Sequence, residues 1–144
     1  MPWEHRATRR VEFHETDMAG IVHFSNFFRY VETVEGDFYR SMGYSVIIRN
    51  TESPLGLPRV HASCDYMKPL RFEDVFEMHL LVREKKAKSV TYEIRFRRLQ
   101  PAPTELVAVA KIVAVCAMKD ASGKMQSTPF PPGLDALLEV APED

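Results

Sequence analysis

The chain has 144 residues, of which 45% are apolar and 27% are charged, a balance typical of one globular domain with a single core. Nineteen basic residues against twenty acidic ones give a formal net charge of −1, which argues against a nucleic-acid-binding surface or attraction to an anionic membrane. The first residues lack the apolar segment of a signal peptide, and no apolar run is long enough to span a membrane. We therefore expect residues 1–144 to form one domain in the cytoplasm.

A short strand is expected near residues 8–14, followed by a turn that contains Asp17 and Gly20. Helical periodicity begins after this turn, because large apolar residues recur at steps of three and four. They are Phe27, Tyr30, Val31, Val34, Phe38 and Met42. Ser25 is placed to cap the start of this helix and Gly43 to end it. The expected solvent side carries Arg29, Glu32, Glu35 and Asp37.

From Arg59 onward the apolar residues alternate with polar ones, which predicts strands with one buried and one wetter face. Four such strands are expected, at residues 60–67, 76–83, 90–97 and 105–119. The last of them is apolar on both faces and is expected to be covered on both sides. Asn50 to Pro58 reads as a surface loop, and a short helix is expected around Leu134 to Val140. The order of one strand, one long helix and four antiparallel strands predicts an α+β fold whose helix lies across a curved sheet.

The junction between the first strand and the helix is suited to acyl transfer. A helix N-terminus presents unpaired N–H groups and a partial positive charge, which can hold an oxygen that becomes anionic. A carboxylate just before it, here Asp17, can act as base or nucleophile on the same bound group. Asp17 is also explained as a turn residue that hydrogen-bonds its own backbone.

The two cysteines, Cys64 and Cys116, are far apart and show no C-x-x-C spacing. A metal site or a disulfide framework is therefore not expected. Both cysteines are predicted to be free and buried, because unpaired cysteine packs as a small apolar residue.

Three segments carry a resemblance to a known family. They are T-D-M-A-G-I-V at 16–22 with N-F-F-R-Y at 26–30 and Glu32, Y-M-K-P-L at 66–70 with Asp74, and P-F-P-P at 129–132. In this order they resemble the 4-hydroxybenzoyl-CoA thioesterase family of hotdog-fold acyl-CoA thioesterases. The resemblance implies one helix wrapped by about five strands, and homodimers with active sites at the subunit interface, often paired into tetramers. It also implies hydrolysis of an acyl-CoA to free acid and CoA without metal or organic cofactor.

The resemblance also implies roles for individual residues. The family's catalytic carboxylate falls on Asp17, and the N–H groups that polarise the carbonyl fall at His23 and Phe24. The bacterial Tol-Pal-associated branch carries a histidine where this chain has Phe24. His23 lies one residue earlier, so we expect it to be a partly buried histidine satisfied by a backbone carbonyl. Gly20 is expected to give the turn conformational freedom and to let substrate approach the backbone, and Asn26 either contacts substrate or supports the helix start.

CoA carries several negative charges, so some basic contact near the pocket mouth is expected. One candidate is the hairpin of Lys85, Lys86 and Lys88 with Ser89, and another is the group of Arg95, Arg97 and Arg98. Both sets are also explained as solvated surface. Glu15 and Glu32 are expected to be solvated or locally paired.

Two other functions compete with the thioesterase. A hotdog hydratase or dehydratase acting on an enoyl-CoA needs a paired acid and base, for which His23 and Asp17 are the nearby pair. A non-catalytic module that binds acyl-CoA or acyl carrier protein would leave Asp17 a structural role. The acyl group, the choice between CoA and acyl carrier protein, and the choice between base and nucleophile for Asp17 are left open by the sequence.

Overall fold

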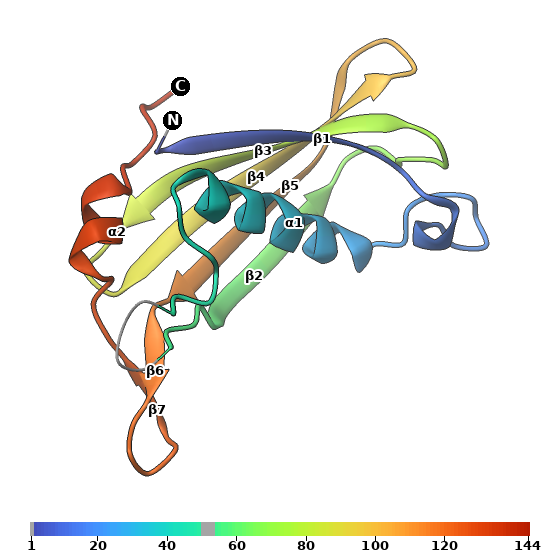
Figure 1. Ribbon diagram of the computed structural model, residues 1–144. Coiled ribbons are helices and arrows are strands. Elements are labelled where there is room, and N and C mark those ends of the chain that lie inside the picture. Colours follow the sequence, from blue (N-terminus) through green and yellow to red (C-terminus); the bar gives the residue numbers. More distant parts are fainter. Residues whose placement is uncertain (1, 50–53) are drawn as a thin grey trace.

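The computed structural model describes residues 2–49 and 54–144, in which one long helix, α1 (Asn26–Ser41), lies across an antiparallel sheet (Figure 1). The sheet has five strands in the order β1-β3-β4-β5-β2. Their bounds are β1 Glu4–Arg10, β2 Arg59–Tyr66, β3 Val75–Lys85, β4 Ser89–Gln100 and β5 Glu105–Val115. The predicted α+β fold, with one long helix and about five antiparallel strands, is confirmed.

Short elements complete the described structure. A 3-10 helix, η1 (Phe13–Glu15), follows β1, and a last helix, α2 (Pro132–Leu137), packs near the two ends of the chain (Figure 1). The strands β6 (Ala117–Lys119) and β7 (Met125–Ser127) form a hairpin that projects away from the sheet (Figure 1). Within residues 2–49 and 54–144, no helix is long and apolar enough to cross a bilayer.

The apolar stripe of α1 forms the centre of the core, as its periodicity predicts. Phe27, Tyr30 and the next stripe residues up to Phe38 are almost fully buried against the sheet. The ring of Tyr30 lies 4.8 Å from that of Phe76 on β3, and the ring of Phe27 lies 5.2 Å from that of Phe96 on β4. Such tilted and edge-to-face aromatic pairs add to the area they bury. Gly43 follows the helix with φ +84°, a conformation that glycine adopts without steric cost.

The prediction that Glu35 lies on the solvent side of α1 is wrong. This residue is only 2% exposed, and its carboxylate accepts hydrogen bonds from both guanidinium nitrogens of Arg59, at 2.8 and 2.5 Å. Burial of a carboxylate requires a well-placed cationic partner. The partner lies 24 residues further along the chain, so the helix pattern could not reveal it.

The predicted ends of two strands are also wrong. The first strand spans residues 4–10 rather than 8–14, because the chain turns at η1, where Glu12 N–H donates to the side chain of Glu15. The strand predicted at 105–119 is broken at Cys116, whose N–H donates to Lys88 and whose carbonyl accepts from Thr128. Beyond Cys116 the chain leaves the sheet and pairs within the β6-β7 hairpin.

Two further predictions need correction. Strand β2 was expected to have one buried face, but it is exposed along nearly its whole length because it lies at the edge of the sheet. The loop predicted at Asn50 to Pro58 is described only from Pro54 onward, since residues 50–53 lie outside the described residues. In its described part Leu55 and Leu57 are buried, so this part is not a plain surface loop. The helix predicted at 134–140 begins and ends earlier, as α2.

Candidate active site

The turn that carries Asp17 is closed by its own backbone. Asp17 N–H donates to the carbonyl of Ile21 at 2.8 Å, and Gly20 N–H donates to the carbonyl of Asp17 at 3.0 Å. One carboxylate oxygen of Asp17 accepts the N–H of Ala19 at 2.8 Å. Gly20 has φ +80°, so the expected conformational freedom is used here. The turn therefore holds the Asp17 carboxylate in one place without burying it.

The two N–H groups predicted to polarise a carbonyl are not equivalent in the structure. His23 N–H already donates to the carbonyl of Glu15 at 3.0 Å. Among the described residues, the N–H of Phe24 has no acceptor. The helix then begins in tight turns, with Asn26 N–H donating to His23 and Phe27 N–H to Phe24. Phe24 N–H is therefore the donor that this conformation leaves for a bound oxygen.

A cavity of about 440 Å³ joins Asp17 to the helix start. Its size falls within the usual range of small-molecule sites. It is lined by Asp17, Ile21, Val22, Phe24, Phe27, Tyr66, Met67, Lys68, Pro69 and Leu70. Most of this wall is apolar, and Asp17 is the acidic group in it. The arrangement places one carboxylate and one unpaired N–H beside a space suited to an apolar acyl group.

Tyr66, at the end of β2, closes one side of this cavity. Its hydroxyl donates to the carbonyl of Phe24 at 3.0 Å, and its ring packs edge-on against Phe27 at 5.2 Å. Burial raises the pKa of Tyr66 to about 12, so the phenol stays protonated and able to donate. Sequence reasoning gave Tyr66 no role at the site, because its partner is a backbone carbonyl 42 residues earlier.

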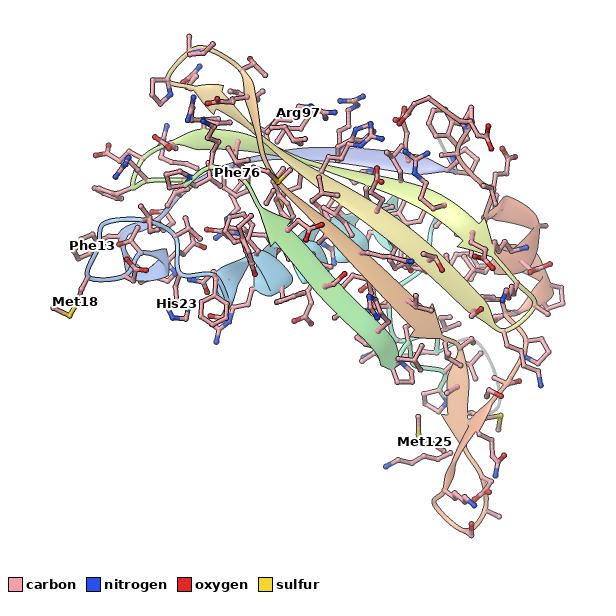
Figure 2. The ribbon with its side chains drawn as sticks, turned by 180° about the vertical axis from the view of Figure 1, so that it is seen from behind. Phe13, Met18, His23, Phe76, Arg97 and Met125 are labelled. Carbon is pink, nitrogen blue, oxygen red and sulfur yellow. The ribbon has the colours of Figure 1, made fainter. Side chains whose placement is uncertain are left out.

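Exposed apolar side chains surround the Asp17 turn. Phe13 is 75% exposed and packs edge-to-face on Phe72 at 5.5 Å, and Phe24 is 62% exposed. Figure 2 shows Phe13, Met18 and His23 at the same end of the molecule. A cluster of exposed aromatic side chains is more typical of a binding surface than of the rest of a protein's surface.

His23 does not match the expectation of a partly buried histidine bound to a backbone carbonyl. Its ring is exposed, its Nδ1 lies 2.7 Å from the hydroxyl of Ser25, and it stacks at 4.7 Å on Phe24. The local turn at the helix start, which sequence spacing does not define, brings Ser25 within reach. The His23 side chain is not part of the cavity wall that contains Asp17.

The side chain of Asn26 supports the helix start, which is one of the two roles considered for it. Its Nδ2 donates to the carbonyl of Glu15 at 2.8 Å. Glu15 is buried and forms an ion pair with Arg9 on β1, so the expected local pairing of this carboxylate is confirmed.

The predicted basic hairpin is far from Asp17 within one chain. Strand β3 runs from the Asp17 end of the sheet, where Val75 pairs with Arg10, to the hairpin at Lys85. Its eleven residues span roughly 33 Å at the usual strand rise. Lys85 is moreover paired with Asp135 of α2 at 2.7 Å. The structure therefore does not bring Lys85, Lys86, Lys88 and Ser89 to the cavity of their own chain.

The second basic group is occupied by acidic partners. Arg95 is bonded to Glu93, Arg97 to Glu77, and Arg98 to Glu105. Figure 2 shows Arg97 on the outer face of the sheet, away from α1.

In the part of the chain that the structure describes, no three His, Cys, Asp or Glu side chains are grouped to hold a metal ion.

Comparisons with known proteins identify the family of the chain. The chain matches the family described as the thioesterase-like superfamily over residues 11–138. It is 40% identical over 131 residues to the protein named "Putative esterase" from Aquifex aeolicus, across 90% of this chain and 93% of that one. It is 26% identical over 136 residues to 1,4-dihydroxy-2-naphthoyl-CoA hydrolase from Thermosynechococcus vestitus, across 94% and 89% of the two chains.

A solved structure shows the same fold. The 4-hydroxybenzoyl-CoA thioesterase from Pseudomonas sp. strain CBS-3 superposes with a TM-score of 0.81 at 21% identity, over 94% of this chain and 99% of that chain. The family match and the shared fold thus define a thioester hydrolase with the hotdog arrangement of helix and sheet. The chain belongs to the thioesterase-like superfamily, and its expected resemblance to the 4-hydroxybenzoyl-CoA thioesterases is confirmed.

Proposed function

We propose that the protein hydrolyses an acyl-CoA thioester to a free carboxylic acid and CoA, without a metal or an organic cofactor. The observation that carries this proposal is that Asp17 and the start of α1, with the unpaired N–H of Phe24, line one apolar cavity. The name of the 1,4-dihydroxy-2-naphthoyl-CoA hydrolase among its relatives supports CoA as the thiol carrier.

In the proposed reaction the thioester carbonyl lies with its oxygen toward the N–H of Phe24. Attack on the carbonyl carbon, by Asp17 itself or by a water that Asp17 deprotonates, places negative charge on that oxygen. The N–H and the partial positive charge of the helix start stabilise this charge. In the water route, collapse breaks the carbon–sulfur bond, the CoA sulfur takes up a proton, and the oxygen of water ends in the carboxylic acid. In the nucleophile route, collapse releases CoA and leaves a mixed anhydride between the acyl group and Asp17, and water then hydrolyses this anhydride to the free acid and restores the Asp17 carboxylate.

The proposal includes assembly into a homodimer, with a pair of dimers as the larger form. Two observations support an active site completed by a second copy. The cavity opens among exposed apolar side chains at the edge of the sheet. The basic hairpin at residues 85–89 is too far away to serve its own cavity, so CoA phosphates would meet the hairpin of another copy.

Both cysteines are free thiols, which fits a reducing compartment such as the cytoplasm.

The hydratase alternative has less support, because His23 does not face the cavity with Asp17.

Turnover of a thioester distinguishes an enzyme from a non-catalytic binding module. The experiment is thiol release from a panel of aryl-, short- and long-chain acyl-CoAs by wild type and Asp17→Asn. We expect wild-type turnover, and a fall of about a hundredfold or more in the variant, since a positioned base contributes about 10²–10⁴ in rate. Equal, feeble rates in both proteins would exclude a catalytic Asp17.

A further inference from the structure

The carbonyl oxygen of Glu15 joins the two halves of the site. It accepts a hydrogen bond from the N–H of His23 at 3.0 Å and a second one from Nδ2 of Asn26 at 2.8 Å. Glu15 lies two residues before Asp17, and His23 lies one residue before Phe24. One backbone oxygen therefore connects the loop that carries the carboxylate to the turn that carries the unpaired N–H.

Glu15 is itself held firmly, so this connection is stiff. The residue is 6% exposed, its carboxylate forms an ion pair with Arg9 at the end of β1, and it accepts the N–H of Glu12 at 2.8 Å. These contacts tie the carbonyl to the sheet. Asn26 approaches it from the first turn of α1 and is half-buried there.

We propose that Asn26 is a positioning residue: through the Glu15 carbonyl, its amide sets the distance between the Asp17 carboxylate and the Phe24 N–H. This inference rests on the proposed function. Asn26 is not part of the cavity wall, so its effect reaches the acyl group only through Asp17 and Phe24. A hydrogen bond between neutral groups contributes little to overall stability. A misplacement of about 1 Å at the reacting groups can cost about a hundredfold in rate.

The first test compares Asn26→Ala with Ser41→Ala. Ser41, at the other end of the same helix, donates its hydroxyl to the carbonyl of Phe38 at 2.6 Å and lies outside the site. Each change removes one bond from a side chain to a backbone carbonyl at one end of α1. For the acyl-CoA that wild type turns over best, we expect Asn26→Ala to lower kcat about tenfold or more, with KM changed less than about twofold. Ser41→Ala should leave kcat unchanged.

The second test uses Asn26→Asp and a pH profile. An ionised carboxyl accepts but does not donate hydrogen bonds, so at neutral pH it faces the Glu15 carbonyl with no proton to share. When the introduced carboxyl is protonated in acid, the donor returns. The rate of Asn26→Asp divided by that of wild type should therefore rise as pH falls. If Asn26→Ala does not fold, the pH profile of Asn26→Asp tests the positioning role of Asn26.

The outcomes separate this inference from the proposed function. A raised KM with kcat unchanged in Asn26→Ala would show that Asn26 contacts substrate and would overturn the inference. Equal kcat in Asn26→Ala, Ser41→Ala and wild type, or a pH-independent ratio for Asn26→Asp, would overturn it while leaving the thioesterase intact. Absence of thiol release by wild type would overturn both.

Discussion

The two ends of α1 are built in opposite ways. At its C-terminal end, N–H groups of Gly43 and Tyr44 satisfy the carbonyls of Arg40 and Tyr39, and Ser41 satisfies that of Phe38. At its N-terminal end, Ser25 holds the cap position but makes no side-chain cap bond. A satisfied cap contributes about 1 kcal/mol to stability. The helix thus omits a stabilising contact at the end that faces the cavity.

Under the proposed function, the N-terminal end of α1 is the one that acts on the substrate. A free N–H at an exposed helix end can bond to water, whereas one beside an apolar cavity is available to a ligand oxygen. The groups that touch the N-terminal end hold its position: Tyr66 binds the carbonyl of Phe24, and the carbonyl of Glu15 binds His23 and Asn26. Both sets of contacts leave the Phe24 N–H open. Changes at this end should alter rate, and changes at the other end should alter stability.

Along α1, the largest effect is expected from Phe24→Pro, which deletes the open N–H just before the helix. Phe24 is the second residue of the turn closed by Asn26 N–H and His23 carbonyl at 2.9 Å, a position that proline favours. We expect kcat to fall about 10²–10³-fold, the usual cost of removing one oxyanion donor. Steady-state thiol release measures it, with circular dichroism to verify the fold.

Its matched control is Phe24→Ala, which removes the exposed ring and keeps the N–H. This variant should show a higher KM, because the cavity loses part of its apolar wall, and a kcat within about tenfold of wild type. If the proline and alanine variants have the same kcat, the N–H of Phe24 does not polarise the carbonyl.

A smaller effect is expected from Tyr66→Phe, which removes the hydroxyl that holds the Phe24 carbonyl. We expect kcat to fall by about threefold to tenfold, because the bond contributes about 1 kcal/mol and the ring still packs on Phe27. Burial raises the pKa of Tyr66 to about 12. The phenol therefore remains a donor below that pH, and the ratio of wild-type to variant rates should be constant from about pH 6 to pH 10. A ratio that declines across this range would contradict the assigned role.

The smallest effect on rate is expected at the opposite end of the helix. Gly43 has φ +84°, and the space around it would admit a Cβ. Gly43→Ala should therefore cost only the backbone strain, about 1–2 kcal/mol of unfolding free energy. Thermal unfolding should show a lower Tm, and thiol release should show an unchanged kcat. A rate loss larger than that of Tyr66→Phe would mean that the two ends are not independent.

The sequence predicted those parts of the fold that depend on local pattern. The apolar stripe from Phe27 to Phe38 and the end of the helix at Gly43 follow from residues a few positions apart. The buried Glu35 and the exposure of β2 could not be predicted in this way. The first depends on Arg59, which is distant in the chain, and the second depends on which strand lies at the edge of the sheet.

The same distinction applies to the site. The sequence predicts the turn around Asp17 and its position before the helix, because turn and helix signals depend on residues close together in the chain. The separation of the Lys85 hairpin from Asp17 depends on the register of β3 with β1 and β4. The contacts of Tyr66 and Asn26 are made to backbone carbonyls, which carry no residue-type signal.

The position of Tyr66 on an edge strand has a consequence for enzyme assays. The outer side of β2 has no neighbouring strand in residues 2–49 and 54–144, so its backbone groups are available to a second molecule. A molecule that pairs with that edge would lie beside Tyr66, which lines the cavity. In the proposed homodimer, dilution below the dissociation constant would remove this neighbour by mass action. Specific activity should then fall as the enzyme is diluted.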